Sequence, residues 1–313
     1  MKQKISIVVP CYNEEEVLPI SSKALLTLLE DMVEEGLISD ESNITFVDDG
    51  SKDKTWAIIN KLSESNPHFK GIKFSRNFGH QNALLAGMTV MNEKSDAIVT
   101  IDADLQDDVN AIREMVSAFL SGYDVVYGVR NNRDSDTPFK RKTANLFYSL
   151  MNKLGVNTIP NHADFRLMSK RATKVLLEFK EENLFLRGMV PLVGFSSTKV
   201  YYSRKERAAG ESKYPLKKMV NFALEGITSF SIVPIRFLRN LGIGVFFVGI
   251  IYMLYIFIQH LIGDVVSGWS SIIISIWLLG GLQLIGMSIV GEYIGKIYFE
   301  VKRRPRFIIE ETI

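Results

Sequence analysis

The chain has 313 residues, with 37 Lys and Arg against 35 Asp and Glu and a net charge of +2. This length accommodates one large domain or two smaller ones with a sizeable core. The near balance of charge excludes the global basic field of a nucleic-acid-binding protein, so no nucleic-acid partner is expected. The single cysteine, Cys11, excludes an intrachain disulfide and a cysteine-cluster metal site, and it fits a reducing compartment.

The chain up to about Phe230 alternates short apolar runs with amphipathic stretches. Residues 1–10 contain only a handful of consecutive apolar side chains, which predicts a strand and not a secretory signal. Strands that alternate with helices are typical of a parallel, doubly wound sheet, so we expect an α/β fold. The predicted strands are Ile5–Pro10, Ile44–Val47, Ile72–Phe74 and Ala97–Ile101, with helices at Glu14–Glu30 and from about Asp53.

The last third of the chain has a different composition. No charged residue occurs between Leu241 and Gly263 or between Val265 and Gly291. Each run is long enough to cross a bilayer core of roughly 30 Å, so two transmembrane helices are predicted, at 240–263 and 265–291. The alternative is a pair of helices buried in a soluble core, but both runs are apolar on all sides.

The distribution of basic residues predicts the orientation of these spans. The loop between them carries Asp264 and no Lys or Arg, whereas both outer flanks are basic. The positive-inside bias therefore predicts a cell-membrane protein whose catalytic domain, 1–213, and both termini are cytoplasmic, with a basic tail at 292–313. The flanking basic residues are Arg236, Arg239, Lys296, Lys302, Arg303, Arg304 and Arg306.

The segment 214–239 places Lys217 and Lys218 among large apolar residues. This mixture predicts amphipathic helices that lie in the membrane interface, where a lipid substrate could enter a nearby cleft. The alternative is ordinary core packing of the last helix of the domain.

Polar clusters follow the carboxyl ends of the predicted strands. In doubly wound sheets, ligands bind at these ends. Asp102 and Asp104 follow a buried strand and point the same way on an extended segment. Together with Gln106 they can converge on Mg²⁺ or Mn²⁺, which prefer oxygen ligands. The alternative is an exposed acidic turn that caps the next helix. Asp48-Asp49-Gly50-Ser51 likewise has a simple interpretation as a turn.

Two common nucleotide-binding motifs are absent from the sequence. There is no Gly-X-Gly-X-X-Gly after the first strand and no Gly-X-X-X-X-Gly-Lys-Ser/Thr. Their absence argues against a nicotinamide enzyme and against a P-loop NTPase.

Four motifs in chain order resemble those of the family 2 inverting glycosyltransferases of GT-A (Rossmann-like) fold. With two C-terminal spans, the chain is similar over nearly its whole length to the polyprenyl-phosphate glycosyltransferases, which include bactoprenol glucosyltransferases and dolichol-phosphate mannose synthases. The motifs are Val9-Pro10-Cys11-Tyr12-Asn13-Glu14-Glu15, Val47-Asp48-Asp49-Gly50-Ser51, Asp102-Ala103-Asp104-Leu105-Gln106 and Asp164-Phe165-Arg166.

The resemblance implies a nucleotide-sugar donor site and a metal site. Asp102, Asp104 and Gln106 would place the divalent metal on the donor diphosphate, where it would neutralise developing charge. Arg130 would lie near the sugar and phosphates, and Arg207 and Lys213 would close over the diphosphate. The residues implied for the nucleotide-sugar site are Pro10, Tyr12, Glu14, Asp48, Asp49, Asp102, Ala103, Asp104, Arg130, Arg207 and Lys213.

The resemblance also implies a site for the lipid phosphate. Lys140, Arg141 and Thr143 lie in the segment where related enzymes bind it, and basic side chains there suit phosphate oxygens. The alternative is a solvated basic helix start.

Asp164 is the candidate catalytic carboxylate, and Asp104, which also belongs to the implied metal site, is the second residue expected to be catalytic. A phosphate monoester has a second pKa near 6, so the acceptor needs little help from a base. Whether Asp164 acts as a base or orients substrate is therefore open. His162 is expected to be structural, and the role of His80 is left open.

The expected reaction is the inverting transfer of a sugar to undecaprenyl phosphate, which gives a lipid-linked donor for cell-envelope glycosylation. The preferred donor is UDP-glucose. UDP-N-acetylglucosamine, UDP-galactose and GDP-mannose are alternative donors. A processive polysaccharide synthase usually carries a Gln-X-X-Arg-Trp motif, and residues 184–188 hold Leu-Phe-Leu-Arg-Gly in that place. A membrane scaffold without catalytic activity is the rival from another class. A homo-oligomer is left open.

Overall fold

The computed structural model describes residues 2–131, 162–181, 186–203 and 269–313, with isolated positions between 235 and 258. These residues belong to two compact units, one of Met1–Asn152, Asn157–Pro215 and Arg304–Ile313, the other of Lys153–Val156 and Leu216–Arg303. Most of the segment 214–239, predicted as amphipathic helices, and most of the first predicted span lie outside the described residues. The site residues outside them are Lys140, Arg141, Thr143, Arg207 and Lys213.

The first unit is built on an eight-stranded sheet in the described part of the chain, with the order β7-β5-β6-β4-β1-β2-β3-β8. The strands β4, β1, β2 and β3 are parallel, and β6 runs antiparallel to both β4 and β5. The predicted α/β class is therefore confirmed. The bounds are β1 Ile5–Cys11, β2 Asn43–Asp48, β3 Phe69–Phe74, β4 Ala97–Thr100, β5 Val125–Arg130, β6 His162–Ser169, β7 Ser197–Tyr202 and β8 Ile309–Thr312.

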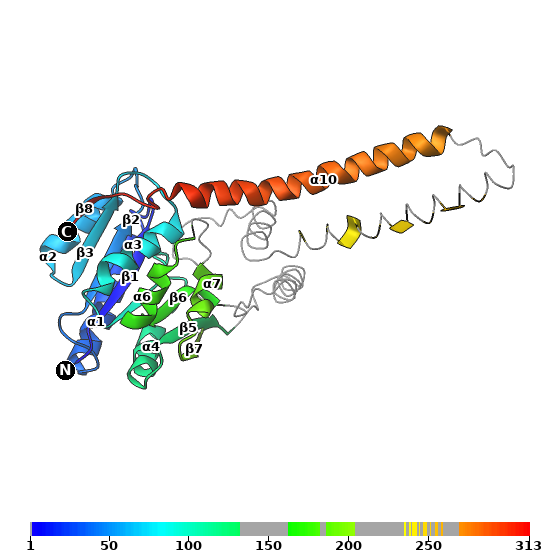
Figure 1. Cartoon of the computed structure of the whole chain (residues 1–313). Helices are drawn as coiled ribbons and strands as arrows, with labels where there is room; N and C mark the ends of the chain where they lie inside the picture. The colour runs from blue at the N-terminus through cyan, green and yellow to red at the C-terminus, as the bar shows by residue number, and fades with distance from the viewer. Residues whose placement is uncertain are drawn as a thin grey trace. The chain divides into compact units, whose positions relative to one another are not determined.

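Helices cover both faces of this sheet (Figure 1). On one face lie α1, α2 and α4, and on the other lie α3 and α6. Because both faces are covered, β1 and β2 are buried along their whole length, as expected of central parallel strands. The helix bounds are α1 Leu18–Glu34, α2 Thr55–Ser65, α3 His80–Asn92, α4 Ala111–Leu120, α6 Lys170–Glu178 and α7 Leu186–Met189, with a 3₁₀ turn at Val190–Val193.

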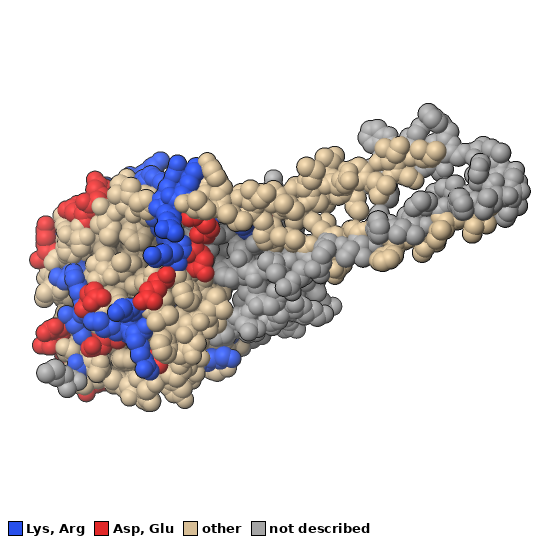
Figure 2. Space-filling view, viewed as in Figure 1, with Lys and Arg blue, Asp and Glu red and all other residues tan. Residues whose placement is uncertain are grey.

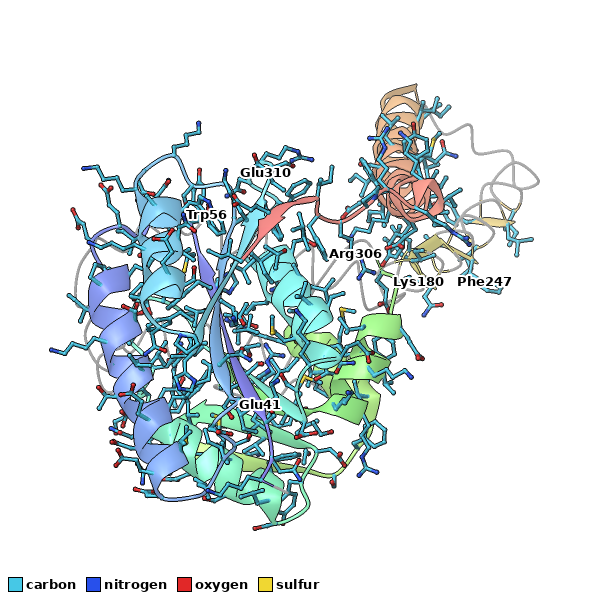
Figure 3. All side chains as sticks on the ribbon, turned by 90° about the vertical axis from the view of Figure 1, so that its left-hand side faces the viewer. Glu41, Trp56, Lys180, Phe247, Arg306 and Glu310 are labelled. Carbon is cyan, nitrogen blue, oxygen red and sulfur yellow. The ribbon has the colours of Figure 1, made fainter. Side chains whose placement is uncertain are left out.

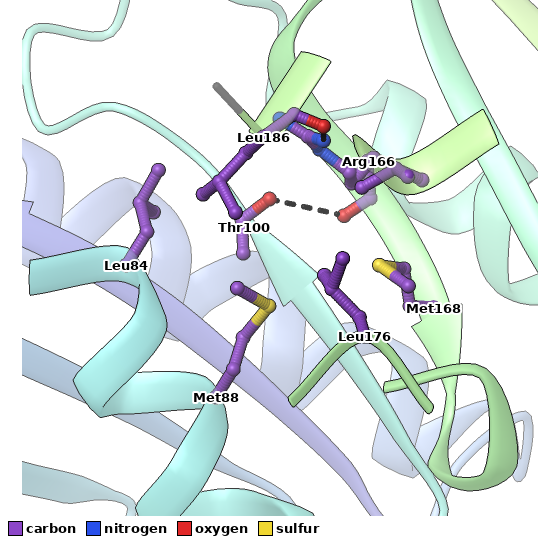
Figure 4. A pocket seen from close by; sticks show the side chains of 8 residues that line it. Leu84, Met88, Thr100, Arg166, Met168, Leu176 and Leu186 are labelled. Carbon is purple, nitrogen blue, oxygen red and sulfur yellow. Dashed lines mark hydrogen bonds between the residues drawn. The ribbon is translucent and has the colours of Figure 1, made fainter. Parts of the chain in front are cut away.

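Alternation along β6 divides its side chains between the two helical layers. Phe165 and Leu167 join the core under α1 and α4. Arg166 and Met168 face the other way, into an apolar contact with Leu84 and neighbouring side chains of α3 and α6 (Figure 4). Arg166 is among the largest fully buried side chains, so its charge needs a partner inside this layer.

The interval 292–313, predicted as a basic tail, has regular secondary structure. Helix α10, Trp269–Lys302, continues through the first part of that interval. The last residues form β8, which pairs antiparallel with β3 at the edge of the sheet. Lys73 Nζ lies 3.2 Å from Glu310 Oε2, in an ion pair, and also lies over the Trp56 ring. Figure 3 labels Trp56 and Glu310. The interval therefore contains a helix end and an edge strand.

Within the described residues, no helix satisfies both the length and the apolar character required of a bilayer-crossing segment. The two predicted spans are therefore not confirmed. Charged side chains are spread over the first unit in Figure 2, whereas the visible side of α10 is largely uncharged.

Candidate active site

The candidate site lies where the strand order of the sheet reverses. Strand β1 is flanked by β2 on one side and by β4 on the other, and all three are parallel. The chain after β1 crosses towards β2, whereas the chain after β4 crosses towards β5 on the other side of β1. In such sheets ligands bind in a crevice at the carboxyl ends of the strands beside this point, so the crevice is expected here. The predicted motifs at Tyr12–Glu14 and Asp102–Gln106 follow β1 and β4 at this point of the sheet.

The loop after β1 is fastened to the loop after β2. Asn13 donates its backbone N–H to Ser51 Oγ at 2.9 Å, and its Oδ1 accepts the N–H of Lys52 at 2.9 Å. Asn13 has a φ of +56°, a left-handed conformation that Asn tolerates better than most residues. Pro10 is buried in β1, while Tyr12 is exposed at the mouth of the crevice. Of the residues predicted for the nucleoside, Tyr12 is exposed and Glu14 is half-buried, whereas Pro10, Asp48 and Asp49 are buried.

Asp49 joins the loop after β2 to the start of α3. Its Oδ1 accepts the N–H of Phe78 at 2.6 Å, and its Oδ2 accepts the N–H of Gly79 at 2.9 Å. Gly50 follows with a φ of +68°, and a Cβ there would lie 2.4 Å from the carbonyl carbon of Arg76. A glycine is therefore required at this turn. Burial raises the pKa of Asp49 despite the two N–H donors.

Asp48 is fully buried beside Asp49. Its Oδ1 accepts the N–H of Ser51 at 3.1 Å, whereas its Oδ2 has no hydrogen-bond partner among the described residues. Burial raises the pKa of Asp48 as well. An unsatisfied carboxylate oxygen at a strand end is costly, which marks it as a candidate ligand-binding atom.

Asp102 and Asp104 border the other side of the crevice. The Asp102 side chain is 36% exposed overall, but its Oδ1 is buried and accepts no hydrogen bond from the described residues. Asp104 Oδ1 accepts the N–H of Gln106 at 3.2 Å. Burial, followed by the charges of Asp164 and Asp107, raises the pKa of Asp102 to about 6, although His80 acts in the opposite direction. Among the described residues, the basic side chain beside this carboxylate is His80.

Asp164 meets Asp102 because of the pairing between β4 and β6. These strands are antiparallel with Thr100 opposite Arg166, and Thr100 Oγ1 donates to the backbone carbonyl of Asp164 at 2.5 Å. Continued by two residues, the same register would bring Asp102 level with Asp164. Arg166 Nη2 donates to Asp164 Oδ1 at 2.5 Å, and Arg187 Nη2 donates to Asp164 Oδ2 at 3.0 Å. Burial would raise the pKa of Asp164, but the charges of Arg187, Arg166 and His80 outweigh it and hold that pKa well below its usual value.

His80, the first residue of α3, lies between the two carboxylates. Its Nε2 is 3.4 Å from Asp102 Oδ1 and 3.9 Å from Asp164 Oδ2. Helix α3 begins after Gly79, whose N–H donates to Asp49 Oδ2, so this contact also positions His80. The site is therefore one connected set of groups drawn from β2, α3, β4 and β6.

Comparison with known proteins identifies the family. The description "Glycosyl transferase family 2" applies to a family model that matches residues 6–177, more than half of the chain. The chain is a family 2 glycosyltransferase. It is 54% identical over 313 residues to "Uncharacterized glycosyltransferase YkoT" of Bacillus subtilis (strain 168), with 99% of this chain and 93% of the relative covered.

Two further relatives of this glycosyltransferase carry a more specific name. It is 42% identical to "SfII prophage-derived bactoprenol glucosyl transferase" of Shigella flexneri, over 99% of this chain and 98% of the relative. It is 43% identical to "Prophage bactoprenol glucosyl transferase homolog" of Escherichia coli (strain K12), over 99% of both chains. The resemblance to the polyprenyl-phosphate glycosyltransferases is thereby confirmed, and the α/β sheet belongs to the GT-A class.

Solved structures resemble the glycosyltransferase more remotely. Glucosyl-3-phosphoglycerate synthase from Mycobacterium tuberculosis matches with a TM-score of 0.45 and 16% identity, over 73% of this chain and 79% of that one. This likeness is too remote to assign a substrate.

The acidic pair of the glycosyltransferase fits a divalent cation that is shared with substrate. Among the residues the structure describes, no three His, Cys, Asp or Glu side chains lie close enough to hold a metal by themselves. Mg²⁺ is commonly held by one or two carboxylates together with substrate phosphates. Asp102, whose buried Oδ1 accepts no hydrogen bond from the described residues, and Asp104 match that pattern, and Gln106 is buried beside them.

Some residues of the site were not predicted to belong to it. Arg166 could have been, because residues two apart on a strand share a face with Asp164. Arg187 reaches the site from α7, and no local pattern indicates that contact. His162 is buried, and its ring packs edge-on against the Tyr127 ring, with the ring centroids 5.6 Å apart, which agrees with a structural role.

Proposed function

We propose that the chain transfers a sugar from a nucleoside diphosphate donor to a polyprenyl phosphate, with inversion at the anomeric carbon. A phosphate oxygen of the acceptor attacks the anomeric carbon, the bond from that carbon to the diphosphate breaks, and the nucleoside diphosphate leaves with the electron pair. No proton has to be removed in this step. The bactoprenol glucosyl transferases that cover nearly the whole chain support the acceptor class.

The observation that carries the proposal is the state of Asp164. Its two oxygens are held by Arg166 and Arg187, and those charges depress its pKa. A carboxylate in that state is a weak base, because a general base works best with a pKa near the operating pH. A hydroxyl acceptor would need a base, whereas a phosphate monoester, with a second pKa near 6, is already largely dianionic. Asp164 therefore serves to orient groups.

Each remaining group has a place in this reaction. A divalent cation at Asp102 and Asp104 would stabilise the charge on the departing diphosphate. Arg187, held by Asp164 and partly exposed, would supply a positive charge on the reaction side of the crevice. Tyr12, Asp48 and the other nucleotide-sugar residues predicted above would hold the donor.

Glucose from UDP-glucose is the donor we propose first, because the relatives include glucosyl transferases. UDP-N-acetylglucosamine, UDP-galactose and GDP-mannose are alternative donors, and contacts in the pocket to the sugar and the base would distinguish them from UDP-glucose. We further propose that the product feeds glycosylation of the cell envelope.

The proposal places the protein in the cell membrane, with two C-terminal spans and a cytoplasmic catalytic domain. It is supported by the two uncharged runs of sequence and by their basic flanks. Helix α10 also exposes Ile276, Leu284 and Met287, large apolar side chains that suit a lipid environment. Alkaline extraction of cell membranes tests this placement: the chain should stay in the membrane pellet, and release into the supernatant would reject the spans.

The reaction is tested with purified full-length protein, undecaprenyl phosphate, Mg²⁺ or Mn²⁺ and a panel of radiolabelled UDP- and GDP-sugars. Label from one donor should enter the lipid fraction, and Asp104→Asn should abolish it. Asp108→Asn, in the same loop, is the matched control and should keep activity. No transfer from any donor by folded protein would reject the enzymatic proposal in favour of a membrane scaffold.

A further inference from the structure

A buried carboxylate next to the site has no part in the roles described so far. Asp107 follows the acidic motif and is almost completely buried. Its Oδ1 accepts the hydroxyl of Tyr202 at 2.6 Å and Nη2 of Arg130 at 3.2 Å. Arg130 Nε in turn donates to the Tyr202 hydroxyl oxygen at 3.2 Å. The three side chains form a closed hydrogen-bonded ring at the carboxyl ends of three strands.

The directions of these hydrogen bonds follow from the chemistry of the groups. A carboxylate only accepts and a guanidinium only donates. The Tyr202 hydroxyl must therefore donate to Asp107 and accept from Arg130, which uses both of its functions. Removal of this one hydroxyl would break two contacts of the ring.

The backbone and the core hold Tyr202 in place. Arg130 and Tyr202 are directly opposite one another on the parallel strands β5 and β7, so their side chains share a face. The Tyr202 ring packs edge-to-face on Phe165, with centroids 5.2 Å apart. The phenol therefore has little freedom to turn away from Arg130.

The ring of contacts leaves part of Arg130 accessible. Nε and Nη2 are held, yet the side chain is 26% exposed, in contrast to the buried Asp107. Burial alone would lower the pKa of Arg130, but the charge of Asp107 outweighs it and the pKa is raised. The cation is thus fixed at the crevice in its charged form.

We propose that Asp107 and Tyr202 are positioning residues that hold the Arg130 guanidinium in one orientation, ready to receive an oxygen anion of the donor diphosphate. This rests on the proposed function, in which Arg130 contacts the sugar and phosphates of the donor. A donor group that is oriented before the ligand arrives loses less conformational freedom on binding. Lysine could not replace Arg130, because it has no second nitrogen for Tyr202 to hold.

Tyr202→Phe is the principal test, because it keeps the ring against Phe165 and removes only the hydroxyl. We expect UDP with Mn²⁺ to bind about five- to tenfold more weakly, with KM for the donor raised by a similar factor, since one of the two hydrogen bonds that orient the Arg130 guanidinium is lost. Thermal unfolding should change little. Tyr201→Phe is the matched control: Tyr201 is the next residue of β7, is 55% exposed and should leave binding unchanged.

A double-mutant cycle with Arg130→Lys separates positioning from a general structural effect. If Tyr202 acts through Arg130, Tyr202→Phe should add almost nothing in the Arg130→Lys background. Equal losses in both backgrounds would overturn the proposal. Asp107→Asn should repeat the pattern of Tyr202→Phe, with Asp108→Asn as its control.

Binding and transfer measurements distinguish the possible failures. UDP binding that Tyr202→Phe and Asp107→Asn leave unchanged overturns the positioning proposal alone. Binding by the wild-type protein without transfer to any lipid phosphate rejects the proposed function, while the binding series still decides the role of Tyr202. No binding of UDP or GDP by wild-type protein rejects both.

Discussion

Two aspartate–arginine clusters lie at opposite ends of β6, and we propose different roles for them. At one end Asp124 accepts Nε and Nη2 of Arg171 at 2.6 and 2.5 Å, together with the hydroxyls of Ser169 and Ser196. These contacts satisfy both oxygens of Asp124. At the other end Asp164 is held as completely, by Arg166 and Arg187. An ion pair by itself therefore does not distinguish a functional site from a structural one.

The surroundings of the two carboxylates make the distinction. Arg171 is 67% exposed, and the pKa of Asp124 is lowered first by its hydrogen bond to Arg171. Asp164 instead faces Asp102, a carboxylate whose pKa is raised to about 6 and whose buried Oδ1 accepts no hydrogen bond from the described residues. We propose the functional role for the cluster around Asp164, because its neighbour Asp102 has a raised pKa, as expected where stability is given up for activity.

The largest effect is expected from Asp164→Asn. This change leaves Arg166 buried without its counter-ion, which should lower stability by roughly 3–5 kcal/mol. Transfer should fall about a thousandfold, as when a preorganised charge is removed from an active site. Lipid-linked label and thermal unfolding of the full-length protein measure the two effects. Near-normal transfer would contradict the assigned role.

Because Asp164→Asn combines two losses, Arg187→Lys serves as the companion variant. It keeps a positive charge beside Asp164 but removes the planar fork. Transfer should fall with much less loss of stability. If stability and transfer instead fell together in Arg187→Lys, Arg187 would be a structural residue.

Asp102→Asn should separate stability from activity. Burial and neighbouring carboxylates disfavour the charged form of Asp102, so the amide should leave the metal-free protein as stable as before, or more stable. Transfer should be lost. Thermal unfolding in EDTA tests the first expectation, and the stabilisation of wild-type but not variant protein by Mn²⁺ with UDP tests the second. A less stable variant in EDTA would contradict this account.

Asp124→Asn should lower stability by about 1–2 kcal/mol, because charge-assisted hydrogen bonds are lost but Arg171 is open to water. Transfer at permissive temperature should be unchanged. Since the folded pKa of Asp124 lies below its ordinary value, its stabilisation is complete above that ordinary value and is lost as the pH falls through the folded pKa. The difference in thermal stability between wild type and variant should therefore persist at pH 7 and fade below about pH 4.

The sequence predicted the sheet well where the information is local. The buried runs of β1, β2 and β4 end within a residue or so of the predicted positions. Strand β3 begins earlier than predicted, because Lys70 and Gly71 interrupt its apolar pattern. Strand β8 was missed altogether, since the short, mostly exposed Ile309–Thr312 owes its conformation to pairing with β3.

The same limit applies to the site. Asp102 and Asp104 could be predicted because parallel strands end at a common edge, and the register of β4 and β6 brings Asp164 to them. Contacts made by Arg187 and Tyr202 could not be predicted, because each joins residues far apart in sequence through tertiary packing alone.

The smallest effect is expected from Ser169→Ala, which tests the cluster around Asp124. Ser169 Oγ donates to Asp124 Oδ1 at 2.8 Å and also caps α6 by accepting the N–H of Ala172 at 3.2 Å. Loss of both contacts should lower stability by about 1 kcal/mol, the usual value of an N-cap, and leave transfer intact. Ser117→Ala on the exposed side of α4 is the control and should change stability less.

The effect of Ser169→Ala should shrink when Asp124 is already Asn, because the Ser169–Asp124 hydrogen bond is then weakened and mainly the cap remains to be lost. Thermal unfolding of the single and double variants measures this coupling. Strict additivity would mean that Ser169 stabilises α6 alone. In that case Asp124 would depend on Arg171 and Ser196 only, and the structural cluster would be a simpler pair than its counterpart around Asp164.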